Sequence, residues 1–154
     1  MSLKDAKQKF SELQEEIVND SYWKHEEEVD NMLELLKEHP DLCSDALKMI
    51  EEYSDDMNGT DKGVLLNNII EIEPELGSDI IRRLDEFDID MNKGLDFIEK
   101  VAKGNPDNKE ILRKCLLLLK MYDSDKKAKS ITNEILTMQP ELKEFSESLT
   151  ALNF

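Results

Sequence analysis

The sequence predicts an all-α protein whose helices form a short α-α superhelix, or solenoid, of about four helix hairpins plus a C-terminal capping helix. Three observations predict it. Only 5 Gly and 4 Pro occur among 154 residues, and the common residues are those of helices. Apolar residues recur at spacings of three and four, as on one face of a helix. The prolines themselves recur at nearly constant intervals, which indicates a repeated unit.

The proline repeat divides the chain. Pro40, Pro74, Pro106 and Pro140 are 34, 32 and 34 residues apart, and an acidic residue follows each of them. Proline fits the first turn of a helix but breaks a helix interior, and an acid in that turn complements the helix dipole. Each proline should therefore end one helix and open the next. The predicted units are residues 1–40, 41–74, 75–106 and 107–140, followed by a capping helix over 141–154.

Each unit also contains a second break near its middle. The breaks are rich in Asp, Asn, Ser and Lys, which favour turns and caps. They fall at Asn19–Ser21, Ser54–Lys62, Asp88–Lys93 and Asp123–Lys127. Between them the apolar residues keep helical spacing, as in Phe10, Leu13, Ile17; Val29, Met32, Leu33, Leu36; Leu47, Ile50, Tyr53; Leu65, Ile69, Ile72; Ile80, Leu84, Phe87; and Leu95, Ile98, Val101.

The helix predicted over 109–122 is apolar around most of its circumference. Its apolar residues are Ile111, Leu112, Cys115, Leu116, Leu117, Leu118, Leu119 and Met121. This pattern predicts a helix buried between neighbours, with a leucine surface exposed for a partner as the alternative. The segment 141–154 places Leu142, Phe145, Leu149 and Leu152 on one face, which suits a helix that covers the last apolar surface of an array.

The charge of the chain limits its partners. It has 20 Lys and Arg against 36 Asp and Glu, a formal net charge of −16. Nucleic-acid binding is therefore disfavoured, because phosphates are neutralised by clustered cations. Net charges of −6, −7, −3 and +2 for the four successive units concentrate the acidity in the first half. A basic protein partner fits this asymmetry, and a surface that serves solubility alone is the alternative.

The two cysteines, Cys43 and Cys115, lie among apolar residues without metal-type spacing, so neither a disulfide framework nor a zinc site is expected. A reduced, cytoplasmic setting is the prediction. The longest leucine run, Leu116–Leu119, is far too short to span a membrane, and the first ten residues do not read as a signal peptide. We therefore expect no membrane association.

The repeat resembles the tetratricopeptide repeat family, whose 34-residue unit is a helix-turn-helix with a small residue in its second helix and a proline at its end. Ala128 lies twelve residues before Pro140, and Gly94 lies twelve before Pro106, as the small residue of the family does. Tyr53 and Phe87 fit the aromatic site of its first helix. An array of helix pairs of the HEAT type is the alternative.

The resemblance implies a concave groove that binds a peptide or another protein. The groove positions it implies are Ser44, Leu47, Glu51 and Asp55; Ser78, Ile81, Asp85 and Asp88; and Glu110, Arg113, Leu117 and Lys120. Such a wall is acidic at first and then mixed, which argues against the carboxylate-clamp type within the family. The predicted partner-binding residues are the charged ones, Glu51, Asp55, Asp85, Asp88, Arg113 and Lys120.

One segment resembles the twelve-residue EF-hand loop. Oxygen ligands are expected at its positions one, three, five and twelve, and Asp88, Asp90, Asn92 and Glu99 supply them. Position six requires glycine for a sharp turn, and Lys93 occupies it. A calcium site is thus a minor alternative, and the prediction is that the protein holds neither metal nor cofactor.

No catalytic constellation is evident. His25 and His39 are the only imidazoles, and neither belongs to an HExxH pattern or lies beside a plausible nucleophile. His25 is expected on a solvated helix face. The sequence therefore predicts a non-enzymatic adaptor that binds a protein or peptide of basic character, with an acidic inhibitor or immunity-type protein and a degenerate calcium-binding protein as alternatives. The sequence predicts no oligomeric state.

Overall fold

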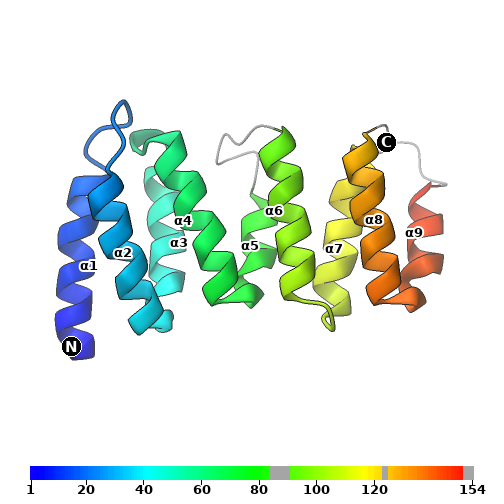
Figure 1. Cartoon of the computed structure of the whole chain (residues 1–154), viewed down its shortest axis with the longest axis horizontal. Coiled ribbons are helices and arrows are strands. Elements are labelled where there is room, and N and C mark those ends of the chain that lie inside the picture. The colour runs from blue at the N-terminus through cyan, green and yellow to red at the C-terminus, as the bar shows by residue number, and fades with distance from the viewer. Residues whose placement is uncertain (84–90, 123–124, 151–154) are drawn as a thin grey trace. The chain divides into compact units, whose positions relative to one another are not determined.

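The computed structural model describes residues 1–83, 91–122 and 125–150 (Figure 1). All regular structure within these ranges is helical, with nine α-helices, four short 3-10 turns and no strand. The predicted all-α class is confirmed. The described residues fall into two compact units. Unit 1 is Met1–Leu76 together with Arg83, and unit 2 is Gly77–Arg82 with the described residues from Met91 onward.

Unit 1 consists of two helix hairpins. Consecutive helices run antiparallel, so that the loops after α1 and α3 lie at the same end of the unit (Figure 1). Helix α2 packs against both α1 and α4, and α3 packs against α4. The elements are α1 (Leu3–Ile17), α2 (Glu26–Glu38), η1 (Pro40–Leu42), α3 (Cys43–Tyr53), η2 (Ser54–Asp56), α4 (Gly59–Ile72) and η3 (Pro74–Leu76).

The core of unit 1 is built from the predicted apolar stripes. Tyr53 and Ile72, at the ends of their helices, are half-buried. The other predicted positions are buried, namely Phe10, Leu13, Ile17, Val29, Met32, Leu33, Leu36, Leu47, Ile50, Leu65 and Ile69. Spacing of three and four residues thus identified the buried faces of all four helices.

Unit 2 begins with a short helix and continues with longer ones. Helix α7 is at its centre and packs against α5, α6, α8 and α9. Gly77 permits the close approach of α5 and α6, because a Cβ on it would lie 2.8 Å from Cγ1 of Val101. The elements are α5 (Gly77–Arg82), α6 (Met91–Gly104), α7 (Lys109–Lys120), α8 (Lys126–Met138), η4 (Pro140–Leu142) and α9 (Lys143–Thr150).

Predicted core positions of unit 2 are also buried where the structure describes them. Ile80, Leu95, Ile98 and Val101 are inaccessible to solvent or nearly so. Leu84 and Phe87 lie outside the described residues. Leu142 and Leu149 are buried and Phe145 is half-buried, and α9 packs against α7 while η4 packs against α8. The predicted Leu152 lies outside the described residues.

Three prolines occupy one repeated local geometry. The residue before each has an extended φ and a similar ψ, with −130° and 75° at His39, −131° and 80° at Glu73, and −135° and 82° at Gln139. Proline disfavours the α conformation in its predecessor, which ends the helix there. In each case the leucine two residues after the proline donates its N–H to the carbonyl before it at 3.0 Å. A 3-10 turn then leads straight into the next helix.

Pro106 differs from the prediction. It forms the same kind of turn, in which the N–H of Asn108 bonds to the carbonyl of Asn105 at 3.1 Å, but no helix opens at the proline. Helix α7 begins only at Lys109, because the side chain of Asn108 accepts the N–H of Ile111 and caps the helix. The other three prolines are followed two residues later by leucine, and Asn108 at that position explains why the turn at Pro106 differs.

Three of the predicted midway breaks need correction. The break at Ser54–Lys62 ends earlier, because Asn58 caps α4 and residues 59–62 are already helical. In the break at Asp88–Lys93, α6 begins at Met91, and residues 88–90 lie outside the described residues. The break at Asn19–Ser21 lies in the loop between α1 and α2 as expected. The break at Asp123–Lys127 also ends earlier, because Asp125 caps α8 and residues 126–127 are already helical, and residues 123–124 lie outside the described residues.

The prediction that helix 109–122 is buried on most sides is only partly correct. Ile111, Leu112, Cys115, Leu116 and Leu119 are buried. Leu117 is 45% exposed and Met121, which follows α7, is 63% exposed. These two residues are four apart, so they share the one side of α7 that its four neighbours leave uncovered. The same side carries the exposed Glu110, Arg113 and Lys114, so the two apolar side chains lie among charged ones.

Candidate functional site

Four of the six predicted partner-binding residues lie within the described ranges, two in each unit. In unit 1, Asp55 is exposed in η2, whereas Glu51 is half-buried and forms a 2.8 Å ion pair with Arg83. In unit 2, Arg113 is exposed on α7 and Lys120 is half-buried at its end. Asp85 and Asp88 lie outside the described residues. The carboxylate of Glu51 is thus already neutralised within unit 1.

Some of the other implied groove positions belong to the core instead. Leu47 and Ile81 are buried, because both lie on the apolar stripe by which their helices pack. Ser44, Glu110 and Leu117 are exposed, and Ser78 accepts a hydrogen bond from Nζ of Lys114 at 2.9 Å. The expected positions are therefore a mixture of surface and core.

The structure of the segment that resembles an EF-hand loop does not fit an EF-hand. Helix α6 begins at Met91, so the segment from the fourth position onward is helical, and Asn92 and Glu99 lie two turns apart. Glu99 lies 3.8 Å from Nζ of Lys103. An EF-hand ligand set needs a twelve-residue loop that wraps the ion. Asp88 and Asp90 lie outside the described residues, and the described ranges contain no group of three or more metal-binding side chains.

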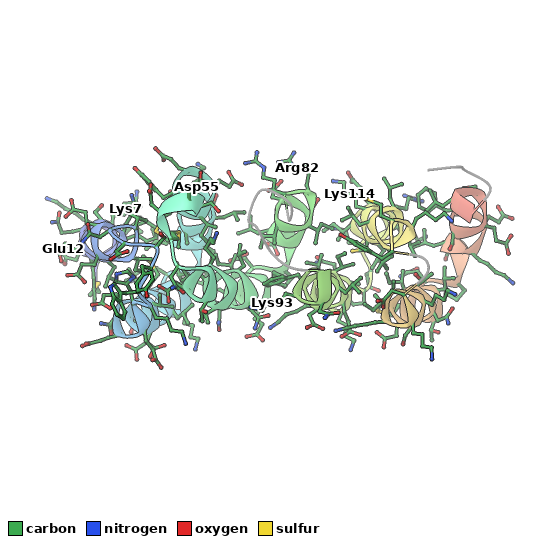
Figure 2. The ribbon with its side chains drawn as sticks, turned by 90° about the horizontal axis from the view of Figure 1, so that it is seen from above. Lys7, Glu12, Asp55, Arg82, Lys93 and Lys114 are labelled. Carbon is green, nitrogen blue, oxygen red and sulfur yellow. The ribbon has the colours of Figure 1, made fainter. Side chains whose placement is uncertain are left out.

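A groove lies between the first helices of the two hairpins in unit 1. It has a volume of about 420 Å³ and is lined by Lys7, Phe10, Ser11 and Gln14 of α1, Leu42 of η1, and Asp45, Lys48, Met49 and Glu52 of α3. Phe10, Leu42 and Met49 form a buried apolar floor, and two lysines and two carboxylates form the exposed rim. Figure 2 shows Lys7 and Asp55 on this side of unit 1. The rim is mixed in charge, not acidic.

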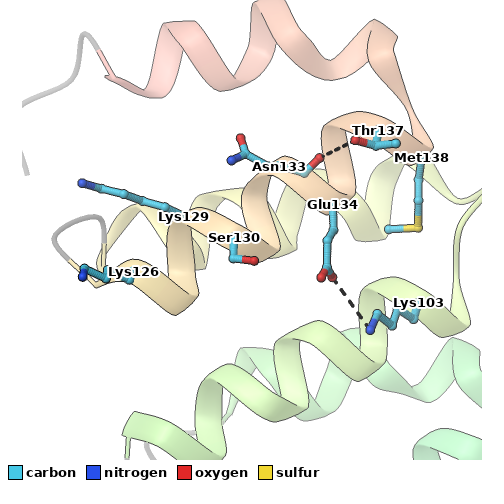
Figure 3. A pocket seen from close by; sticks show the side chains of 8 residues that line it. All are labelled: Lys103, Lys126, Lys129, Ser130, Asn133, Glu134, Thr137 and Met138. Atoms are coloured by element: carbon cyan, nitrogen blue, oxygen red, sulfur yellow. Dashed lines mark hydrogen bonds and ion pairs between the residues drawn. The ribbon is translucent and has the colours of Figure 1, made fainter.

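Unit 2 has a depression of about 700 Å³ between α6 and α8 (Figure 3). It carries three lysines and one carboxylate, and Nζ of Lys103 lies 3.9 Å from Glu134. Thr137 donates a hydrogen bond to the carbonyl of Asn133 at 2.9 Å. Its lining consists of Lys103, Lys126, Lys129, Ser130, Asn133, Glu134, Thr137 and Met138. These residues project from regular helices and do not combine a nucleophile with a base.

A second hollow of unit 2, of about 460 Å³, lies among α7, α8 and α9. Leu116, Leu119, Ala128 and Leu149 give it an apolar floor, and Lys120 and Lys129 are at its edge. Like the groove of unit 1, it combines an apolar floor with a polar edge. Such surfaces suit the side chains of a bound segment.

A polar cluster in unit 1 fixes the loop between α1 and α2. Asp61, in the first turn of α4, is buried and accepts the backbone N–H of His25 at 2.9 Å, with Nδ1 of the same histidine at 3.3 Å. His25 precedes α2 and is half-buried, so the expectation of a solvated helix face is wrong. Next to it, Lys62 is buried and donates to the hydroxyl of Ser54 at 3.2 Å.

Replacing Asp61 with alanine should destabilise unit 1 by roughly 1–3 kcal/mol, because the part-buried N–H of His25 loses its acceptor. Asp61→Asn keeps a carbonyl oxygen and should lose less. Asp56→Ala, which removes an exposed carboxylate three residues before α4, is the matched control and should change little. Urea unfolding followed by circular dichroism measures the differences, and equal stabilities of the Asp61→Ala and Asp56→Ala variants would contradict the assignment.

Neither cysteine has the character of a nucleophile. Both thiols are free and buried. Burial raises the pKa of Cys115 to about 12, and burial together with the charge of Glu73 raises the pKa of Cys43 to about 12. The reactive thiolate is therefore scarce at neutral pH.

Comparisons with known proteins found no matching family model, no matching curated protein and no matching solved structure. No helix within the described ranges is long and apolar enough to cross a membrane. The candidate site therefore has to be judged by its own geometry. The groove between α1 and α3 is our candidate for binding, since it joins a buried apolar floor to exposed charges and lies between the first helices of two successive hairpins.

Proposed function

We propose that this chain is a helical-repeat protein, similar to the tetratricopeptide repeat type, which binds a segment of another protein and has no catalytic activity. The proposed binding site for that segment is the groove between α1 and α3. The presence of this groove is the observation on which the proposal rests. In the tetratricopeptide family, which the sequence resembles, the first helices of successive hairpins form the binding wall. α1 and α3 are the first helices of the two hairpins in unit 1.

The recurrence of one local geometry supports the repeat part of the proposal. The turns at Pro40, Pro74 and Pro140 share both their backbone angles and their hydrogen bond. Chain segments that repeat the same helix end and the same helix start can stack in the same way each time. We propose that the whole chain forms such a short solenoid, with α9 as its capping helix.

The charge of the chain supports a partner segment of basic character. Residues 1–74 contain 7 Lys and Arg against 20 Asp and Glu. A field of this sign raises the rate at which cationic segments arrive, while the apolar floor of Phe10, Leu42 and Met49 would provide the anchor. The lysines on the rim, Lys7 and Lys48, suggest that the seated segment also carries an acid.

The same charge favours a second candidate, an acidic inhibitor or immunity-type protein that masks a basic enzyme or toxin. In that case many exposed carboxylates would contribute and the complex would dissociate at about 0.5 M salt, since the Debye length then falls well below 10 Å. An adaptor that holds an apolar anchor would keep its partner at that ionic strength.

A variant that fills the groove tests the proposed binding site. Ser11→Trp puts an indole into the space between α1 and α3, whereas Gln8→Trp puts it on an exposed position of α1 outside the groove. Partners captured from the source cell by the unmodified protein should be at least tenfold depleted with Ser11→Trp, a loss of about 1.4 kcal/mol, and retained with Gln8→Trp. Quantitative mass spectrometry measures this depletion, and equal capture by both variants would exclude the groove.

A further inference from the structure

Two aromatic side chains project from unit 1 into solvent. Tyr22 is 78% exposed and Trp23 is 64% exposed, both in the loop between α1 and α2. Their rings meet edge to face, with centroids 4.9 Å apart and an interplanar angle of 82°. Large aromatic side chains are normally buried, and exposed ones are enriched at binding surfaces. Packing within unit 1 does not account for this pair.

The backbone beneath the pair is held in place from three directions. The N–H of Tyr22 bonds to Oδ1 of Asp20 at 2.9 Å. The side-chain amide of Asn58 donates to the carbonyls of Ser21 and Tyr22 at 3.2 and 3.4 Å. At the other end of the loop, His25 is bonded to the buried Asp61. The rings are thus displayed on a preorganised loop, which lowers the conformational cost of binding.

Exposed carboxylates lie in the segments next to the pair. Asp20 is in the same loop, Glu26 and Glu27 open α2, and Asp55 and Asp56 lie in η2, close to the Asn58 that bonds the loop. Figure 1 shows the loop and η2 at the same end of unit 1. Among the described residues none of these five carboxylates takes part in an ion pair. Lys24 is the single lysine or arginine of the loop. The aromatic pair therefore lies in a negative local field.

We propose that the Tyr22–Trp23 loop is a docking site for a protein segment that presents an arginine beside an apolar residue. A guanidinium stacks on the face of an indole ring and is attracted by its quadrupole, and the flanking carboxylates add charge complementarity. The apolar neighbour packs on the remaining ring surface. Aromatic side chains at a lipid surface are instead usually accompanied by cations, and nucleic-acid phosphates would be repelled here.

This site is separate from the groove between α1 and α3, because none of its residues lines that groove. It does not depend on the repeat proposal. Loss of binding in the groove variant Ser11→Trp would leave the aromatic loop intact, and the converse also holds. The two proposals can therefore fail independently.

The experiment uses the full chain and its one tryptophan, whose emission reports only on the loop. The probe is the peptide acetyl-GSRLRSG-amide, compared with versions in which both arginines are lysine or glutamate. The arginine peptide should shift the emission of Trp23 saturably, with a weaker effect of lysine and none of glutamate. Its affinity should fall as salt rises, because the carboxylates are exposed.

Variants of the protein show which residues bind the peptide. Their affinity for a labelled arginine peptide is measured by fluorescence anisotropy. The double change Tyr22→Ala with Trp23→Ala should weaken binding about fivefold or more. Asp55→Asn with Asp56→Asn should weaken it less, and Lys24→Gln should strengthen it. Val64→Ala, at an exposed apolar position on α4, is the control and should leave the affinity unchanged.

Three results would overturn the proposal. One is an emission that stays constant up to about 5 mM arginine peptide, where even weak specific binding is detected. Another is an equal response to the glutamate peptide. The third is a saturable shift with phosphatidylserine vesicles that exceeds the shift with the peptide, which would assign the pair to a membrane surface.

Discussion

Removal of residues 141–154 should lower the free energy of unfolding of unit 2 by several kcal/mol and cause aggregation. The deletion takes away Leu142 and Leu149, which are buried against the rest of unit 2. Each buried leucine is worth roughly 1.5–3 kcal/mol relative to exposure. It also uncovers Leu116 and Leu119 of α7, which line the hollow beneath α9. Exposed apolar surface of this kind promotes association.

Urea unfolding and light scattering measure these two effects. Glu144→Ala with Glu147→Ala changes two exposed residues of α9 without touching its buried side, and this variant should match the unmodified protein within about 0.5 kcal/mol. The ion pair between Glu141 and Lys109 is exposed and should contribute little to the loss. Unchanged melting and solubility after the deletion would show that α9 does not cap unit 2.

The helix ends were largely predictable because their signals are local. A proline restricts its own φ and the conformation of the residue before it, so Pro40, Pro74 and Pro140 act in the same way whatever packs around them. Pro106 shows the limit of such reasoning. The side chain of Asn108, two residues later, offers a better cap than the proline turn, and the helix starts there.

The buried faces were predictable for the same reason, but the degree of burial was not. Periodicity assigns a residue to a side of a helix, whereas the neighbours decide whether that side is covered. Leu116 and Leu117 are adjacent and chemically identical, yet the first is buried and the second is half exposed. The placement of α5, α6, α8 and α9 around α7 decides which of them is covered.

The conformation of the aromatic loop could not be predicted from the sequence, because the contacts that hold it are tertiary. Asp61 and Asn58 lie more than thirty residues from the loop they hold, so no local pattern connects them to His25 or Tyr22. One signal was present in the sequence. The adjacent aromatic residues Tyr22 and Trp23 lie in a segment, Asn19 to Glu28, that contains no other apolar side chain. A pair of this kind indicates a binding surface, since tyrosine and tryptophan are enriched there.

Two leucine-to-alanine changes on α7 should differ strongly in their cost. Leu112 has no exposed surface, and Leu117 is 45% exposed. Leu112→Ala removes buried methyl groups and leaves a cavity, which should cost about 2–5 kcal/mol. Leu117→Ala removes partly solvated atoms at a position where alanine is the better helix former, so its cost should stay below about 1 kcal/mol.

These two variants isolate the effect of burial on stability, because both replace leucine with alanine in the same helix. Chemical denaturation measures both variants, and amide hydrogen exchange in α7 shows whether the loss is confined to unit 2. If the exposed side of α7 contacts a partner, Leu117→Ala should reduce partner capture while leaving stability unchanged. Equal destabilisation by both changes would mean that Leu117 is covered in solution. The conclusion that this side of α7 is exposed would then be wrong.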